Sequence, residues 1–302
     1  MTFVLALLPV IAVVSIGYIL AHRNSLPPEG WRGIERLCYV LIFPCLIIRV
    51  LATAPFDESP WRMALALIAA QIAMAGVGHA ARFSPGIARP AIGCIIQSNV
   101  RWNTFVALSL AGTLFGDEGL ALTAVAAAAM IPTANIISVL GFSQYGEAHI
   151  RRHPLLEMFQ NPLVIACIIG GLINVSGLGI PAIADQVMAT LASAALPMGL
   201  LVAGAGLNLN ALKHTGTRTL VWSLVRLLLM PILAISVGLV LDVSDVSLAV
   251  IAIAAATPTA TNGYVLARQL GGDAPFMANL IAAQTVLAVL TMPLIMWLFD
   301  LG

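Results

Sequence analysis

The chain has 302 residues, of which 60% are hydrophobic and only 9% are charged, and its formal net charge is +1. Soluble domains carry about 25% charged residues, so a soluble fold of this length could not cover its surface with so few charges. The composition therefore excludes a soluble protein. Because the basic residues sit in short loops between apolar runs, the charge gives no indication of nucleic-acid binding.

Apolar runs of about 20 residues, the length that a helix needs to cross a bilayer, recur along the whole chain. Turn-like segments rich in glycine, proline and acidic residues separate them. Ten membrane-spanning helices are predicted, at 3–21, 34–52, 61–81, 90–112, 119–142, 157–176, 182–206, 217–241, 246–268 and 274–299. The sequence thus predicts an all-α integral membrane protein, whose main partner is the lipid bilayer.

The basic residues alternate between the two sets of loops. One set holds Arg23, Arg32, Arg36, Arg82, Arg89, Arg151, Arg152, Lys213, Arg218 and Arg268. The opposite set holds Arg62 among several acidic residues. The positive-inside rule predicts that the basic loops are cytoplasmic, so both termini are extracytoplasmic in a multi-pass protein of the plasma membrane, or of the inner membrane in a Gram-negative cell.

The two halves of the chain resemble each other. FPCLII around Pro44 resembles LPMGLL around Pro197, and Asn103 and Asn262 each precede a Gly-Asp pair in their halves. With five spans in each half, the second half enters the membrane in the opposite sense, which makes an inverted repeat typical of secondary transporters. The predicted domains are a first repeat at 1–143, a cytoplasmic linker at 144–156 and a second repeat at 157–302.

The fourth predicted span carries a polar cluster, Asn99, Arg101, Asn103 and Thr104, in an otherwise apolar run. An arginine at the bilayer centre costs at least about 2.5–3.5 kcal/mol, so such residues face a protein interior or a water-filled path. No proline lies between Pro90 and Pro132, so an opening in this helix must come from the asparagines and Thr104. Arg101 is interpreted as the counter-charge of an anionic substrate, or alternatively as a structural arginine that is ion-paired or extends toward the membrane surface.

The ninth predicted span contains Pro258, Thr259, Asn262, Gly263 and Tyr264, a run that cannot form a regular apolar helix because proline removes a backbone donor. A broken helix would offer free amides and the positive end of a helix dipole to an anion. The alternative is a proline-kinked helix whose hydroxyls bond its own carbonyls.

Three further polar residues lie inside predicted spans. Asn135 and Gln284 are candidates for the site or for contacts between helices, and Arg226 is a structural partner or a ligand. Arg49, near the outer end of its span, is expected to reach toward the membrane surface. No acidic residue lies well inside a span, which disfavours a carboxylate proton relay or a carboxylate-rich sodium site, and a cation site built from carbonyls and amides stays open.

No metal site, no cofactor and no enzymatic activity are predicted, since HExxH, GxSxG and Walker sequences are all missing.

The runs RWNTFVALSLAGTLFGDEGLAL, IPTANIISVLG, NPLVIACIIGGLIN, ALPMGLLVAGAGL and ATPTATNGYVLARQLGGD together resemble the auxin efflux carrier family, most closely its bacterial malate or malonate permeases. The resemblance covers essentially the whole chain. It implies ten helices in two inverted five-helix repeats, a plan shared with bile-acid transporters. It also implies scaffold and transport domains that are each built from both repeats, an elevator-type motion, and a homodimer through the scaffold.

In that family the fourth and ninth helices are broken and cross near the substrate. The family's fourth-helix asparagine matches Asn103, and its ninth-helix proline and asparagine match Pro258 and Asn262. Plant members have a proline shortly after that first asparagine, whereas the corresponding stretch here, 107–111, has none. A less sharply broken fourth helix is therefore expected.

The function predicted from the sequence is secondary transport of a small organic anion, such as a carboxylate or an auxin-like acid. Proton or sodium coupling stays open. The alternatives are a sodium-coupled symporter of the bile-acid type and, from other classes, a channel or a membrane sensor.

Overall fold

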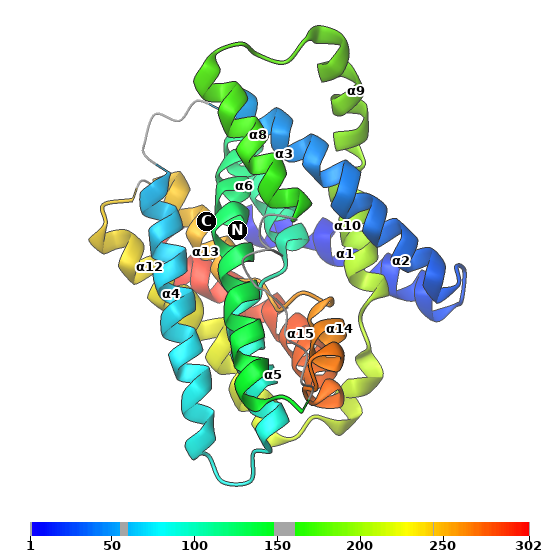
Figure 1. Ribbon diagram of the computed structural model, residues 1–302, viewed down its shortest axis with the longest axis vertical. Coiled ribbons are helices and arrows are strands. Elements are labelled where there is room, and N and C mark those ends of the chain that lie inside the picture. The colour runs from blue at the N-terminus through cyan, green and yellow to red at the C-terminus, as the bar shows by residue number, and fades with distance from the viewer. Residues whose placement is uncertain (1, 55–59, 148–160, 244, 302) are drawn as a thin grey trace.

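The computed structural model describes residues 2–54, 60–147, 161–243 and 245–301, and within these residues every regular element is a helix. The α-helices are α1 (Thr2–His22), α2 (Pro28–Leu37), α3 (Phe43–Thr53), α4 (Trp61–His79), α5 (Arg89–Val100), α6 (Thr104–Tyr145), α8 (Pro162–Ser176), α9 (Ala182–Ser193), α10 (Ala195–Ala205), α11 (Thr217–Leu224), α12 (Met230–Val240), α13 (Asp245–Ala256), α14 (Gly263–Gln269) and α15 (Ala274–Leu298). Figure 1 shows how they are arranged.

Several of these helices join end to end. A π-helical turn, Cys38–Ile42, connects α2 to α3, and a second one, Val225–Leu229, connects α11 to α12. Seven helical stretches of the described chain are long and apolar enough to cross a membrane, which confirms an all-helical, multi-pass membrane protein. Pro162–Ser176 and Val246–Ala256 are shorter apolar helices at the predicted sixth and ninth spans.

The predicted fourth and fifth spans lie in one largely helical stretch, Arg89–Tyr145, which is interrupted between α5 and α6 and is not straight. Gly116 has a φ of 58° and a ψ of −140°, which only glycine adopts readily, so α6 bends there. Gly119 lies directly against the backbone of Ala111, eight residues earlier, so the chain turns back on itself at this point. The turn falls in the GDEG segment that the sequence marks as a separator.

Two pairs of helices approach each other very closely through glycines. Gly17 of α1 lies on the backbone of Leu201, and Gly204 of α10 lies on the backbone of Val14, so α1 and α10 pack without intervening side chains. In the same way Gly170 of α8 lies on the backbone of Ile48 in α3. Both pairs lie side by side in Figure 1.

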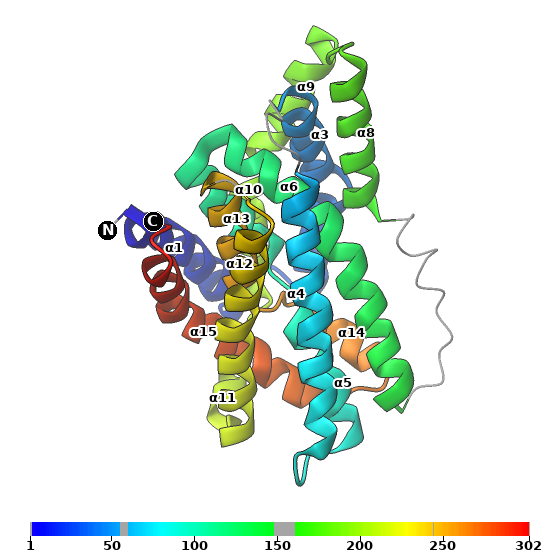
Figure 2. The same cartoon turned by 90° about the vertical axis from the view of Figure 1, so that its left-hand side faces the viewer.

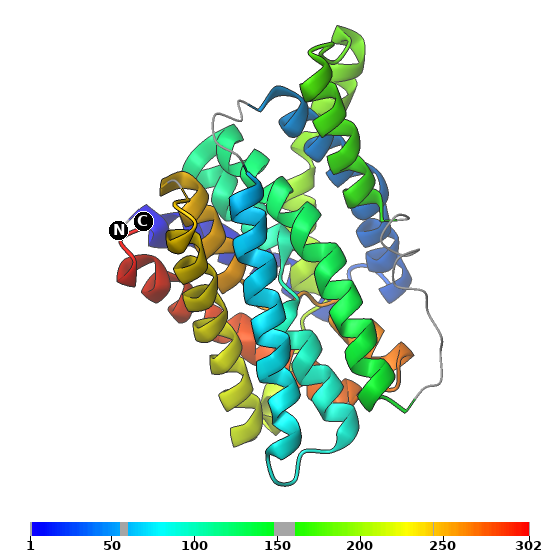
Figure 3. The same cartoon turned by 60° about the vertical axis from the view of Figure 1, so that its left-hand side comes forward.

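The remaining helices pack into a second group. The helix α4 contacts α5, α6 and α12, and α13 contacts α6, α12 and α15. Figure 3 shows α4 running between α12 and the second half of α6. The first turn of α1 and the last turn of α15 lie next to each other in Figure 2, at the left-hand side of the molecule.

One charged residue has a partner that the sequence did not indicate. Arg49 of α3 donates two hydrogen bonds to the carboxylate of Asp185 in α9, with Nε–Oδ1 and Nη2–Oδ2 distances of 2.6 and 3.2 Å. The expectation that Arg49 reaches toward the membrane surface stays a prediction, and the structure adds that a carboxylate 136 residues away meets its guanidinium in a bidentate pair.

The predicted division into repeats at 1–143 and 157–302 stays a prediction at this level. Most of the predicted linker, 144–156, lies outside the described residues.

Candidate functional site

Two helical interruptions occur where the sequence places its polar clusters. The first, residues 101–103, separates α5 from α6, and the second, residues 257–262, separates α13 from α14. Arg101 and Asn103 have extended backbone angles, and Asn103 caps α6 by accepting hydrogen bonds from the amides of Phe105 and Val106, both at 3.2 Å. An asparagine cap thus begins the second helix without a proline.

The carbonyls that the first interruption leaves without helical partners are satisfied by side chains from other helices. The Ser98 carbonyl accepts from Thr259 Oγ1 at 2.8 Å, and the Val100 carbonyl accepts from Gln71 Nε2 at 2.8 Å. The Arg101 carbonyl accepts from Arg226 Nη2 at 3.1 Å. A helix end leaves several carbonyls unpaired, and burial without such partners would be costly.

The second interruption is held in the same way. Gln97 Nε2 donates to the Gly263 carbonyl at 2.8 Å, and the Thr259 amide donates to Gln284 Oε1 at 3.0 Å. Thr257 Oγ1 donates to the carbonyl of Ala254 at 2.9 Å and accepts from the Asn103 amide at 3.3 Å. The two interruptions therefore contact each other directly, through polar groups that are almost entirely buried.

Arg101 donates hydrogen bonds to two other residues predicted from the sequence. Its Nη1 donates to Asn262 Oδ1 at 3.3 Å, and its Nη2 donates to Asn135 Oδ1 at 2.7 Å. These partners come from the second interruption and from the second half of α6. Both of these partners are neutral amides, and the two hydrogen bonds orient the guanidinium.

A cavity of about 690 Å³, here called the central cavity, lies beside these residues. Six of the predicted site residues line it, namely Arg101, Asn103, Thr104, Asn135, Asn262 and Tyr264. Its other charged lining residues are Arg32, Glu35, Arg36 and Arg268. Among the described residues that line it, four are arginines and one is a glutamate, so this part of the lining is positive and its electrostatics favour an anion.

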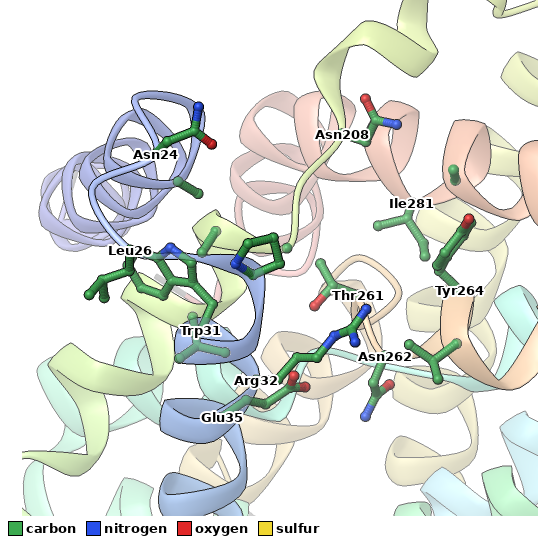
Figure 4. A pocket seen from close by; sticks show the side chains of 17 residues that line it. Asn24, Leu26, Trp31, Arg32, Glu35, Asn208, Thr261, Asn262, Tyr264 and Ile281 are labelled. Carbon is green, nitrogen blue, oxygen red and sulfur yellow. The ribbon is translucent and has the colours of Figure 1, made fainter.

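A second cavity of about 450 Å³ adjoins the first, and the two share Arg32, Glu35, Asn262, Tyr264 and Val265 as lining residues. Figure 4 shows Arg32 of α2 extending toward the loop that carries Thr261 and Asn262, with Glu35 beside it. Trp31 and Asn208 line the far parts of this second cavity. Both cavities thus lie against the loop of the second interruption.

The other predicted site residues lie behind this surface, and neither cavity is lined by them. Asn99 is fully buried and donates to the Met74 carbonyl of α4 at 3.2 Å. Pro258 and Thr259 are buried in the second interruption, and Gly263 is buried where its carbonyl accepts from Gln97. In this structure these four residues hold the interruptions together, and none of them reaches the cavity surface.

Of two further buried side chains at the site, Gln71 was absent from the sequence-based candidates, and Arg226 was considered there as either a structural partner or a ligand. Gln71 is fully buried in α4 and donates to Val100 and to Met130, and its polarity within an apolar run was the available signal. Arg226 is fully buried and donates to the carbonyls of Ala255 and Arg101. Within the described residues, no group of histidine, cysteine and acidic side chains is arranged to hold a metal ion.

The fold and these interruptions define a multi-pass helical membrane protein with a charged internal cavity. Residues 2–142 and 148–296 match the membrane transport protein family, and the chain belongs to that family. The match confirms, at family level, the resemblance to auxin efflux carriers. Over 133 residues the chain is 29% identical to an uncharacterized transporter of Methanothermobacter thermautotrophicus (strain Delta H), in an alignment that spans 44% of this chain and 44% of that relative.

Proposed function

We propose that the protein is a secondary transporter that moves a small organic anion, of carboxylate or auxin-like chemistry, through the central cavity. The observation that carries this proposal is the cavity itself. It lies where two interrupted helices meet, and the described residues that line it include four arginines and one glutamate. Membership of the membrane transport protein family supports transport, and the positive lining supports an anion.

Arg101 is the proposed anchor of the anion. Its guanidinium lines the cavity and is oriented by Asn262 and Asn135, so a planar carboxylate would meet a preorganised fork of donors. Asn103, Thr104 and Tyr264 would complete the site with hydrogen bonds. The residues behind them, Asn99, Pro258, Thr259 and Gly263, would support the shape of the site.

The helix packing supports the inverted repeat of five spans each. The first span, α1, packs on α10 of the seventh, and α3 of the second packs on α8, the sixth. A two-fold exchange of the halves would map one of these pairs onto the other. The adjacent first turn of α1 and last turn of α15 fit an even number of crossings, and so fit two termini on the same, extracytoplasmic side.

The same packing suggests how alternating access would occur. The close pairs α1–α10 and α3–α8 would form the scaffold, and the group around α4, α5, α6, α12, α13 and α15 would carry the substrate past it as an elevator. Arg32, Arg36 and Arg268, which belong to the predicted cytoplasmic side, are exposed and line the central cavity. The described conformation would therefore open to the cytoplasm.

The test is thermal stabilisation of the purified protein by a panel of anions, from malonate and malate to indole-3-acetate. An anion at about 100 times its Kd stabilises the folded state by about 2.7 kcal/mol, and for a chain of this size that raises Tm by roughly 5 °C. We expect at least one carboxylate to give such a shift. We expect Asn103→Ala and Asn262→Ala to lose most of it.

The matched control is Asn174→Ala, which removes an asparagine that donates to the carbonyls of Ala52 and Ala54, away from the cavity. This variant should keep the full anion-induced shift even if its own Tm falls. If Asn103→Ala and Asn262→Ala both keep the shift as well, the anion does not bind at the interruptions. If only neutral compounds or cations give a shift, the substrate class is wrong.

A further inference from the structure

Arg226 is a charged side chain in the interior of a membrane span. It lies in the π-helical turn between α11 and α12, and its side chain is completely buried. Turns of this kind occur frequently at functional sites. Burying an arginine inside a membrane span costs free energy unless specific partners stabilise its charge. The partners of Arg226 therefore indicate its role.

The partners of Arg226 are backbone carbonyls at the helix ends where the two interruptions begin. Its Nη1 donates to Ala255 in the last turn of α13, and its Nη2 donates to Arg101, directly after the end of α5. Two helix C-termini, each the negative end of a helix dipole, thus point their carbonyls at one positive charge. The only salt bridge among the described residues is Arg49–Asp185, so no described carboxylate neutralises Arg226.

Carbonyls of unwound backbone and the C-terminal ends of half-helices are the groups with which secondary transporters coordinate a coupling sodium ion or proton. Here one guanidinium occupies that position. We propose that Arg226 is a built-in cation, which binds the carbonyl ends of both interrupted helices where a coupling cation would otherwise bind. Sodium then has no role between the two interruptions. Their contact with each other does not depend on an ion from solution.

One consequence of this inference rests on the proposed transport function: transport would proceed without a sodium ion bound between the two interruptions. Arg226 is a positioning residue, because it acts on the substrate site through the Arg101 backbone. Its test needs no substrate, so it can fail or succeed independently of the proposed anion site.

The experiment measures Tm of the purified protein in sodium, lithium, potassium and choline chloride at one ionic strength. The wild type should melt at the same temperature in all four salts. Arg226→Ala should melt roughly 5–10 °C lower in choline, because it leaves buried carbonyls without a partner. Sodium, or guanidinium at about 20 mM, where its denaturing effect is small, should restore at least half of that loss. Arg226→Lys, which keeps the charge, should lose less than half as much as Arg226→Ala.

The matched control is Arg62→Ala. Arg62 also donates to carbonyls at the end of a helix, those of Leu241 and Asp242 after α12, but it is exposed. Its Tm should change little and should not respond to the cation. Stabilisation of the wild type by sodium would overturn the proposal, and so would an Arg226→Met variant that is as stable as the wild type. These two measurements decide the matter even if Arg226→Ala does not fold.

Discussion

Replacing Arg101 by alanine is expected to weaken carboxylate binding by roughly 10- to 150-fold, which corresponds to a charge-assisted hydrogen bond of about 1.5–3 kcal/mol. The loss is large because Asn262 and Asn135 already orient the guanidinium. Little conformational entropy is therefore lost when the anion binds. The measurement is a titration of Tm, or of intrinsic fluorescence, with the carboxylate that stabilises the wild type most.

The matched control for this prediction is Arg268→Ala. Arg268 lines the same cavity but is exposed, so water and salt screen its charge. Its removal should weaken binding no more than about threefold, the size of a screened surface interaction. Equal losses in the two variants would mean that the anion senses only the total charge of the cavity, and Arg101 would then have no special role.

Replacing Gly204 by alanine is expected to have the largest effect on stability. A Cβ at this position would overlap the carbonyl oxygen of Val14, and neither backbone can withdraw without separating α1 from α10. Overpacking usually costs about 1–3 kcal/mol and more where nothing can yield, so Tm should fall by roughly 5–10 °C or the folded protein should be lost. Differential scanning fluorimetry in detergent measures this.

Gly171→Ala is the matched control, because it makes the same glycine-to-alanine substitution within a helix. Gly171 lies within α8, and no atom lies within 4 Å of the position that its Cβ would take. Alanine in an open helical position is more stable than glycine by about 0.5–1 kcal/mol, so this variant should melt at or above the wild-type temperature. A Gly204→Ala protein with unchanged Tm would show that α1 and α10 are not in backbone contact.

The helical class and the places of the two interruptions could be predicted from residue types alone. In the ninth span, Pro258 and its polar neighbours cannot continue a regular apolar helix. The fourth span has no proline at its interruption. There the Asn103 side chain caps the start of α6. The residue types at these positions therefore predict where a membrane helix ends and where the next one begins.

The partners across the fold could not be predicted in this way. Arg226 meets carbonyls 29 and 125 residues away, and any residue type supplies a carbonyl, so no sequence pattern marks these contacts. Gln71 was visible as a polar residue in an apolar run, but its choice of Val100 depends on how α4 packs on α5. The Arg49–Asp185 pair likewise needs α3 and α9 to be adjacent.

The central claim is alternating-access transport of an organic anion, and counterflow in proteoliposomes tests it most directly. Vesicles loaded with the unlabelled carboxylate are diluted into the labelled one, with choline as the external cation. The account predicts saturable uptake that internal substrate accelerates, that needs no sodium, and that falls to the level of empty liposomes in Arg101→Ala. A flux that rises linearly with concentration and is indifferent to internal substrate would contradict it, because that is the behaviour of a channel.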